Sequence, residues 1–525
     1  MAMYRRRTRL RGRRAPGRAP GRTGVWLALG ALLLAGGTAC GDGGSGKAAE
    51  ESADPSARPS ADSGEAASQR NIVFVLTDDL SEDLVQYMPH VEEMRKAGLS
   101  FADYTVTDSL CCPSRSSIYT GKYPHNTGVF TNTPPDGGFD VFHQEGNEDH
   151  TFATSLQKRG YRTAMMGKYL NRYEPDMTVG GEKNYVPPGW DEWAVAGNGY
   201  PEYDYTLNEN GRTVKYGHEP EDYLTDVVSR KGQDFITESA KDGKPFVLDI
   251  STFAPHGPAT PAPEDEEKFA SLKAPRPPSF DKLPEDAPKW LADRKPLPEK
   301  QLRKIDRNYR ERVRSVQAVD RMIGDLQTRL RKEGVYEDTV FVFASDNGFH
   351  LGEYRLTPGK QTAFDTDVKV PLIVTGPGVP EGRTSHAVVG NIDLAPTFTA
   401  LGGGTPAPEV DGRSLVPLLG GETPKDWPRA ALIEHHGAKD TAEDPDRPRK
   451  GSGNPPGYEA IRTADVTYVE YADGSREFYD RRRDPDQLHN TYGELSAERK
   501  KELARQVAAL RACEGAKECG AAAGS

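Results

Sequence analysis

The chain has 525 residues, with 68 Lys and Arg residues against 79 Asp and Glu residues, a formal net charge of −11. An acidic protein of this kind is a poor candidate for nonspecific binding to nucleic acid, which requires a large cationic surface. Five cysteines are too few for a disulfide-rich scaffold, and the length allows one large domain or two to three ordinary ones.

The N-terminus has the pattern of a targeting signal. Residues 1–39 contain nine arginines, no acidic residue and the uncharged apolar run Val25–Ala35. Eleven residues suit the core of a signal peptide and are too few to span a bilayer. The run leads to Gly37-Thr38-Ala39-Cys40, which resembles a bacterial lipoprotein cleavage site. We expect an exported protein whose only membrane contact is a lipid on Cys40; ordinary secretory cleavage near Ala39 is the alternative.

A spacer follows the predicted leader. Residues 41–70 contain no aromatic and no large aliphatic residue, so they cannot bury enough surface to offset the entropy of ordering. We expect residues 40–70 to form a disordered linker. Without the nine arginines of the leader, 59 basic residues face the same 79 acidic residues, which gives the remainder a formal charge of −20.

Apolar runs and helical periodicity predict an α/β domain over residues 71–427. Four apolar runs have the pattern of strands that are buried on both faces of a sheet; they are 72–76, 246–250 (interrupted by Asp249), 340–344 and 372–374. Apolar residues recur at steps of three and four over 302–333, which predicts a long helix ending at Gly334. Strands that alternate with helices indicate a large, mainly parallel sheet flanked by helices.

The remaining segments indicate a long excursion and a second domain. Residues 254–299 contain eleven prolines and little periodicity, typical of an ordered loop that contributes substrate contacts. Segments 467–472 and 476–479 flank Asp473-Gly474, a strong hairpin signal, and an amphipathic helix is expected over 496–511. We therefore expect a smaller C-terminal α+β domain with an antiparallel sheet over residues 428–525.

Polar residues follow two of the predicted strands. Asp78 and Asp79 come directly after the first strand, and Asp346 and Asn347 after the strand 340–344. Ligands of parallel α/β sheets bind beyond the carboxyl ends of the strands, where these side chains would meet. Carboxylate and amide oxygens suit Ca²⁺ or Mg²⁺. For either Asp pair alone, a helix cap or a turn is the plainer interpretation.

The most specific stretch is CCPSRSSIYTGK at residues 111–122. A buried thiol pair at a helix start is the ordinary explanation of two adjacent cysteines. With the aspartates upstream and Ser345-Asp346-Asn347-Gly348 downstream, the stretch resembles the signature of the type I sulfatases. Further segments that are similar to this family are GKYLNRY, APHGP, KVPLIVTGPG and EFYDRRRDPDQLHN, and the pattern is most like the N-acetylglucosamine-6-sulfatase and arylsulfatase branch.

The resemblance implies the fold, activity and cofactors of that family. The fold would be an alkaline-phosphatase-like sandwich, and the reaction the hydrolysis of sulfate esters of sugars or aryl alcohols. A formylglycine-generating enzyme would oxidise Cys111 to formylglycine, whose hydrate is the nucleophile. Asp78, Asp79, Asp346 and Asn347 would hold Ca²⁺, with Mg²⁺ as an alternative, and residue 111 would lie at the ion. The substrate would be a sulfated small molecule or glycan.

Six further residues receive catalytic roles from the resemblance. Arg115 would orient the nucleophile, Lys122 would support the same centre, and His125 would accept a proton. Lys168, His256 and Lys360 would bind sulfate or protonate the leaving oxygen. Taken alone, the lysines are ordinary surface residues, and His125 is an ordinary turn residue.

Several points stay open at this stage. Many family members have a histidine two residues after the lysine of Gly167-Lys168, which this chain lacks, so Asn171 is a candidate sulfate contact. His350 and Glu353 are equally suited to a pocket or a loop. Cys112 is expected to be a packed thiol, and Cys513 and Cys519 are close enough in sequence for a local disulfide. The competing functions are a phosphonate or phosphate ester hydrolase of the same superfamily, and a noncatalytic surface binding protein that retains the fold.

Overall fold

A computed structural model of the chain describes residues 69–437, 444–449 and 451–524. The predicted leader (1–39), with Cys40 and all but the last two residues of the predicted linker (40–70), lies outside the described residues. Among the residues that are described, no helix combines the length and the apolar character needed to cross a membrane.

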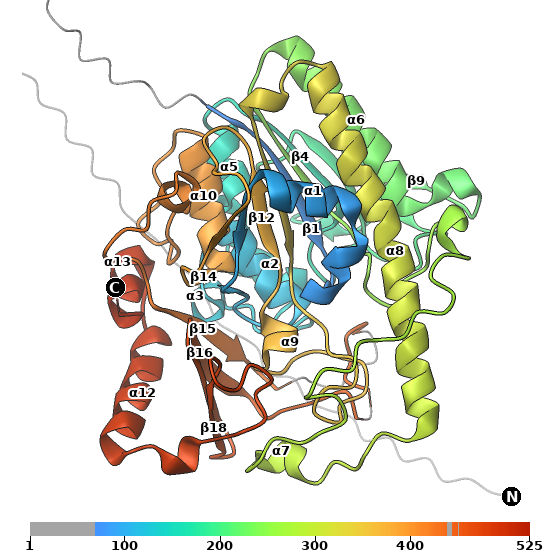
Figure 1. Cartoon of the computed structure of the whole chain (residues 1–525). Coiled ribbons are helices and arrows are strands. Elements are labelled where there is room, and N and C mark those ends of the chain that lie inside the picture. The colour runs from blue at the N-terminus through green and yellow to red at the C-terminus, as the bar shows by residue number, and fades with distance from the viewer. Residues whose placement is uncertain (1–68, 438–443, 450, 525) are drawn as a thin grey trace, which may run out of the picture. The chain divides into compact units, whose positions relative to one another are not determined.

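The main sheet places its five central strands in parallel (Figure 1). In order across the sheet, its strands are β13 (Arg383–Ser385), β2 (Leu99–Phe101), β12 (Leu372–Thr375), β11 (Thr339–Ser345), β1 (Asn71–Thr77), β10 (Phe246–Ser251), β4 (Arg162–Lys168), β7 (Glu192–Ala196), β8 (Thr206–Glu209) and β9 (Arg212–Lys215). The parallel group runs from β11 to β7, and β12, β8 and β9 pair antiparallel with their neighbours. The predicted mainly parallel sheet is confirmed, and each of the four predicted apolar runs lies within a strand.

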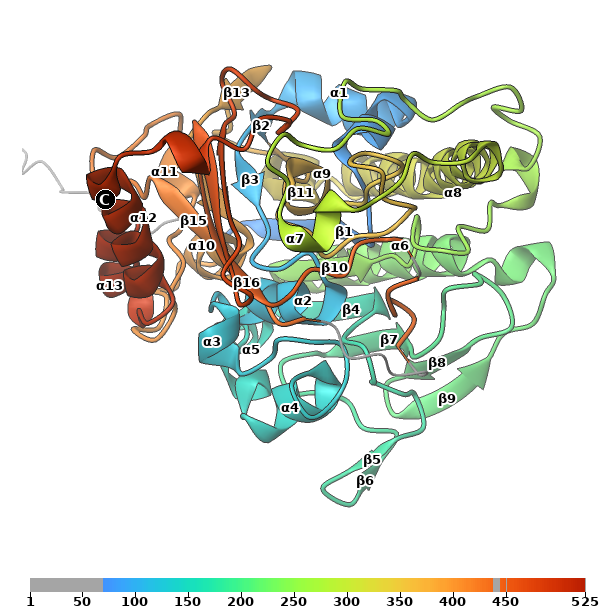
Figure 2. The same cartoon turned by 90° about the horizontal axis from the view of Figure 1, so that it is seen from below.

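Helices cover both faces of this sheet. Alternate residues of β1 enter two different cores, with Ile72, Phe74 and Leu76 in one and Val73 and Val75 in the other. The first core is shared with α2 (Cys111–Thr120), α4 (Gly138–Gln144), α5 (Phe152–Gln157) and α10 (Leu394–Leu401), and the second with α1 (Pro89–Ala97), α6 (Leu224–Asp242) and α8 (Glu299–Lys332). In Figure 2, α1 and α8 lie on one side of the strands, and α4 and α5 on the other. This sandwich explains the apolar runs, because each strand is buried on both faces.

The C-terminal part forms a second sheet, as predicted. It is antiparallel, in the order β15 (Ala430–His435), β16 (Tyr458–Thr463), β17 (Val466–Tyr471) and β18 (Arg476–Asp480). Helix α12 (Ala497–Leu510) packs its apolar side chains against one face of this sheet. A disulfide joins Cys513, which precedes α13 (Gly515–Ala522), to Cys519 within that helix. The predicted local disulfide is therefore present.

Short elements fill the connections. They are α3 (Pro124–Thr127), α7 (Lys289–Ala292), α9 (Asp365–Val368), α11 (Val416–Leu419), the strand pair β3 (Tyr104–Thr105) with β14 (Val389–Gly390), and the strand pair β5 (Thr178–Val179) with β6 (Glu182–Lys183). In the proline-rich excursion, single β-bridges join Phe280 to Glu353 and Glu285 to His489. The excursion therefore crosses from the main sheet to the residues that follow the C-terminal sheet.

Candidate active site

The ends of β1 and β11 bring four predicted metal ligands together. Thr77 and Ser345 are paired as the last residues of the two strands, so Asp78–Asp79 and Asp346–Asn347 leave the sheet side by side. All four residues are buried, with at most 1% of each residue exposed. Carboxylate oxygens of the three aspartates and the Sγ atom of Cys111 all lie within 4.8 Å of one another.

Asp79 is held in an unusual backbone conformation. Its φ of +68° is left-handed, which costs a residue with a side chain roughly 1–2 kcal/mol. Two hydrogen bonds fix it: the Asp79 N–H donates to Asp346 Oδ1 at 3.2 Å, and Arg312 donates to the Asp79 carbonyl oxygen. Such strain is typical of functional sites, where the surrounding structure has to maintain it.

Cys111 begins helix α2 at the edge of this cluster. Its thiol donates to Asp78 Oδ1 at 3.1 Å, while its neighbour Cys112 packs in the hydrophobic core. Both thiols are free. Burial raises the pKa of Cys112 to about 12. Burial, together with nearby Asp446 and Asp78, also raises the pKa of Cys111 well above its usual value. Both side chains are therefore neutral thiols.

Arg115 lies one turn further along α2 and contacts an aspartate of the cluster. Its Nε donates to Asp346 Oδ2 at 2.7 Å, and Nη1 donates to the Lys168 carbonyl at 2.8 Å. Neither partner of this ion pair is exposed to solvent. Arg115 therefore fixes Asp346 and balances its charge.

Two lysines complete the ion pairing of the cluster. Lys168, at the end of β4, donates to Asp78 Oδ2 at 2.5 Å. Lys360 donates to Asp79 Oδ1 at 2.7 Å, and its Nζ lies 2.9 Å from Cys111 Sγ. Burial alone would lower the pKa of both lysines, but the surrounding aspartates raise it well above the usual value. Both side chains are therefore ammonium ions.

His256 follows β10 on the same side of the sheet. Its Nε2 lies 3.7 Å from Asp79 Oδ2 and 2.7 Å from Asp446 Oδ1. Burial would lower the pKa of His256, but Asp79 and Asp446 raise it to about 8.

Lys122 and His125 are not brought to this cluster. An α-helix rises about 1.5 Å per residue, so the ten residues of α2 carry Lys122 about 15 Å along the axis from Cys111. The ring of His125 bonds Glu434 through Nδ1 at 2.7 Å and the Cys513 carbonyl through Nε2 at 2.9 Å. Because both ring nitrogens of His125 are used far from the cluster, the predicted role in proton transfer has no support in this geometry.

The three remaining candidates from the sequence, His350, Glu353 and Asn171, form hydrogen bonds with residues outside the acidic cluster. His350 is fully buried and bonds the Asp367 carboxylate at 3.0 Å and the Ser452 carbonyl at 2.7 Å. The Glu353 carboxylate accepts a hydrogen bond from the Leu351 N–H at 2.6 Å. Asn171 donates weakly to the Tyr200 hydroxyl, at 3.5 Å.

Sequence reasoning missed three residues of this site. The Asp446 carboxylate bonds His256 and Lys360, and Asn132 Nδ2 donates to Asp446 Oδ2 at 2.8 Å. Arg312 donates to the carbonyl oxygens of Asp79 and Pro255. A charged residue within the apolar stripe of α8 was a signal for Arg312, because a buried arginine needs acceptors. No periodicity or motif pointed to the other two residues.

A cavity of about 200 Å³ opens onto the cluster. Its lining includes Asp79, Tyr200, His256, Lys360 and Asp446. Tyr200 also forms a cation–π contact with Lys168, whose Nζ lies 5.0 Å from the ring centre. The cavity therefore gives access to His256 and Lys360, next to the acidic cluster.

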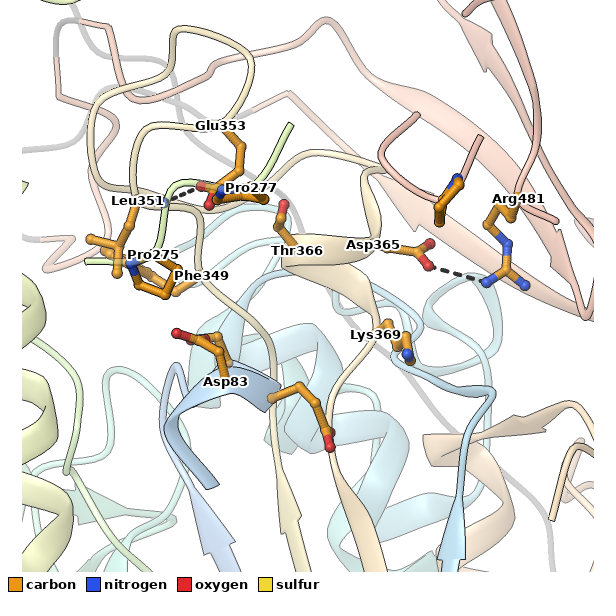
Figure 3. Close-up of a pocket in the computed structure, with 13 residues that line it drawn as sticks. Asp83, Pro275, Pro277, Phe349, Leu351, Glu353, Asp365, Thr366, Lys369 and Arg481 are labelled. Carbon is orange, nitrogen blue, oxygen red and sulfur yellow. Dashed lines mark hydrogen bonds and ion pairs between the residues drawn. The ribbon is translucent and has the colours of Figure 1, made fainter. Parts of the chain in front are cut away.

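A larger cavity, of about 490 Å³, lies beside it and shares Phe349 as a lining residue (Figure 3). Two of its acidic side chains have partners within the lining. Asp365 binds Arg481 at 3.1 Å, and Glu353 accepts from Leu351, as the dashed lines in Figure 3 show. Because Asp79, His256 and Lys360 line the smaller cavity and none of them lines this one, the smaller cavity holds the candidate chemistry.

The residues of the cluster fit a hard divalent cation. Asn347 Nδ2 donates to Asp79 Oδ1 at 2.7 Å, whereas its buried Oδ1 has no hydrogen-bond partner in the described chain. An unpartnered buried amide oxygen beside three carboxylates is a donor set for Ca²⁺ or Mg²⁺. Burial and the neighbouring Asp78 raise the pKa of Asp346 to about 6. A bound cation would stabilise the ionised carboxylate at this position.

The fold and the site define an α/β protein of the alkaline-phosphatase-like class, with acidic and cationic side chains gathered at the carboxyl edge of the sheet. The sulfatase family model matches residues 70–404, and the model of the N-sulphoglucosamine sulphohydrolase C-terminal region matches residues 352–513. The chain therefore belongs to the sulfatase family. The predicted family and the predicted enzyme class, a sulfuric ester hydrolase, are confirmed.

Individual relatives agree with this assignment. N-acetylglucosamine-6-sulfatase of Capra hircus is 34% identical over 473 residues, which cover 85% of this chain and 84% of the relative. The extracellular sulfatase SULF-1 homolog of Drosophila melanogaster is 36% identical over 398 residues, which cover 74% of this chain but only 35% of that longer protein. A structure solved with its substrate, D-glucosamine-2-N,6-O-disulfate, has a TM-score of 0.70 at 25% identity and covers 84% of this chain and 97% of its own.

Proposed function

We propose that this chain hydrolyses sulfate esters at residue 111, after Cys111 is converted to formylglycine, with Ca²⁺ bound beside it. One observation carries the proposal: Cys111 Sγ lies 3.1 Å from Asp78 Oδ1 and 2.9 Å from Lys360 Nζ. The reactive atom at position 111 therefore lies between the proposed ion site and the cations that face the cavity.

The proposed conversion answers a chemical need at this position. The Cys111 thiol is neutral because burial raises its pKa, and a neutral thiol is a poor nucleophile. Formylglycine, made by a formylglycine-generating enzyme, would supply the hydroxyl oxygens of an aldehyde hydrate. Asp78 accepts a hydrogen bond from the side chain at position 111 and is the group placed to hold such a hydroxyl.

Asp78, Asp79, Asp346 and Asn347 are the residues that would hold the ion. Ca²⁺, or Mg²⁺ as the alternative, would supply positive charge next to the sulfate of the substrate. Arg115 binds Asp346 and is therefore a positioning residue for this ligand set.

Lys168, His256 and Lys360 would act on the substrate. Hydrolysis of a sulfate ester needs positive charge around the sulfuryl oxygens and a proton for the leaving oxygen. Lys360 and His256 line the cavity, and Lys168 contacts the ring of Tyr200, which also lines it. Donors on these three side chains would bind the sulfate oxygens, and one of them would protonate the leaving alcohol.

A sulfated glycan is the substrate class that we propose. Relatives of this chain are named N-acetylglucosamine-6-sulfatase and extracellular sulfatase, and a solved relative holds a glucosamine disulfate. These names support sulfated glucosamine units, with aryl sulfates as synthetic substrates.

We also propose that the protein acts outside the cell. The Cys513–Cys519 disulfide is typical of proteins that fold in an oxidising compartment. The arginine-rich leader and Cys40 support export, with a lipid anchor at Cys40 or, as the alternative, free secretion.

Matched esters test this function. Protein coexpressed with a formylglycine-generating enzyme in the presence of Ca²⁺ should hydrolyse an aryl sulfate faster than the corresponding phosphonate ester. Cys111→Ala, prepared in parallel, controls for contaminating hydrolases. Faster phosphonate turnover would assign the chain to the alternative hydrolase class, and no turnover of any ester by converted protein would favour a binding protein.

A further inference from the structure

A carboxylate of the chain itself occupies the anion-binding part of the cavity. The Asp446 side chain is only 3% exposed. Its Oδ1 accepts from His256 Nε2 at 2.7 Å and lies 2.9 Å from Lys360 Nζ. Its Oδ2 accepts from Asn132 Nδ2 at 2.8 Å and lies 3.4 Å from Cys111 Sγ. The two carboxylate oxygens of Asp446 thus accept hydrogen bonds from the donor groups that surround residue 111.

These donors form a receptor for an oxyanion. His256 and Lys360 are the groups that the proposed function assigns to the sulfate, and Cys111 is the site of attack. Hydrogen bonds from charged donors to oxyanions are short and strong, and the single Nε2–H of His256 can serve only one such acceptor at this geometry. A second anion 3–4 Å away would also be repelled by the first. Asp446 and the sulfate of a substrate therefore compete for one place.

Polar contacts alone hold this carboxylate in place. The Asp446 N–H donates to Asp444 Oδ1 at 2.9 Å, and Gln361 Nε2 donates to the Asp446 carbonyl at 3.2 Å. Asn132 also bonds Asp444, at 3.1 Å. Residues 444–449 contribute no member to the hydrophobic cores of the described chain. Withdrawal of Asp446 exchanges hydrogen bonds with those of an incoming anion and with water, and it exposes no apolar core.

We propose that Asp446 is a tethered competing anion that sets the anion selectivity of the active site. This inference rests on the proposed function of the cavity. Either anion has to displace the carboxylate, which weakens the binding of both by the same factor. The displaced carboxylate stays nearby, and it repels inorganic sulfate, a dianion, more than a sulfate ester, which carries a single negative charge. Asp446 therefore disfavours free sulfate more than it disfavours the ester, and it returns to the receptor when the product leaves.

Sulfate binding to the Asp446→Asn variant tests this inference. An asparagine has the shape of the aspartate without its charge, and Asp446→Ala removes the side chain altogether. If the carboxylate occupies the receptor nine-tenths of the time, either variant should bind inorganic sulfate at least tenfold more tightly than the unchanged chain. Calorimetry in the presence of Ca²⁺ measures this on protein with an unconverted Cys111 thiol. Asp293→Asn makes the same charge change at an exposed position and should leave the affinity unchanged.

Two results would overturn the proposal. One is sulfate affinity in both variants that is unchanged or weaker, which would make Asp446 no competitor of sulfate. The other is a loss of Ca²⁺ affinity of tenfold or more, measured by calorimetry, which would make Asp446 a metal ligand, since its carboxylate lies with Asp79 and His256 in a second group of possible ligands. Because binding is measured without turnover, absence of sulfatase activity would count against the proposed function alone.

In the converted enzyme, the same variants give a second readout. Inhibition by inorganic sulfate should become more than tenfold stronger, because both the occupancy and the repulsion are removed, while KM for an aryl sulfate falls by a smaller factor. Equal changes in both constants would contradict the selectivity that we assign to Asp446.

Discussion

The buried ion pair between Arg115 and Asp346 gives the sharpest test of how the site is held together. Both side chains are fully buried, and Arg115 Nε lies 2.7 Å from Asp346 Oδ2. Removing one partner of a buried pair leaves an uncompensated charge and typically costs about 3–5 kcal/mol. Arg115→Met keeps much of the side-chain volume and removes the charge, so the free energy of unfolding should fall by this amount in EDTA.

A double-mutant cycle separates the pair from other effects of the substitutions. Asp346→Asn and the Arg115→Met/Asp346→Asn double variant complete the cycle, measured by urea unfolding in EDTA to avoid bound metal. We expect a coupling energy of about 2 kcal/mol or more, because the double variant leaves no buried charge unpaired. The exposed Arg303–Glu299 pair, whose side chains are 69% and 82% exposed, is the matched control and should show at most about 0.5 kcal/mol.

Added Ca²⁺ provides an independent check on the same variant. If Asp346 is a ligand, the ion compensates the charge that Arg115→Met leaves unpaired, and Ca²⁺ should restore part of the lost stability. A coupling energy below about 0.5 kcal/mol in the buried pair would refute the assignment of Arg115 as the residue that fixes Asp346.

Four further predictions follow from the contacts described. Cys111→Ala should abolish aryl sulfate turnover while the unfolding curve stays within about 1 kcal/mol; residual activity would exclude residue 111 as nucleophile. His125→Asn should change kcat less than about threefold but destabilise the chain by about 1–2 kcal/mol, because buried Glu434 loses its partner; a hundredfold loss of kcat would restore the sequence prediction. Asn347→Ala should weaken Ca²⁺ binding in calorimetry by at least tenfold, and an unchanged affinity would remove this ligand. Burial raises the pKa of Glu477 to about 7, so folding favours the protonated carboxyl. Its contribution, about 3 kcal/mol, is fully present below about pH 4.5 and is lost as the pH rises through 7. Urea unfolding between pH 5 and 8 should therefore depend less on pH in Glu477→Gln, and an identical slope would contradict the shift.

Much of the fold was predictable because buried strands and helices have recognisable patterns of apolar residues. Strands β1, β10 and β11 have helices on both faces, so they appear as apolar runs, which Asp249 interrupts in β10. The acidic pairs after β1 and β11 meet because the carboxyl ends of adjacent parallel strands lie at one edge. Position along the strands therefore placed the candidate metal ligands correctly beside one another.

The remaining part of the site could not be read from linear proximity. Lys122 and His125 are close to Cys111 in sequence, but the straight helix α2 separates them from it in space. Asp446 contacts Cys111 from 335 residues away, out of an irregular, proline-containing segment that has no periodicity to place it. Contacts made by irregular segments depend on tertiary structure. The sequence therefore suggested Lys122 and His125, which are near Cys111 in the chain, and not Asp446.

The state of residue 111 in active protein tests the central claim most directly. The tryptic peptide that contains Cys111, Cys112 and Arg115 should be analysed by mass spectrometry after thiol alkylation, on protein from the native host that hydrolyses an aryl sulfate. We predict one alkylated cysteine, at position 112, and formylglycine at position 111. If fully active protein instead yields a peptide in which both Cys111 and Cys112 are alkylated, residue 111 was an unconverted thiol, which would contradict the account.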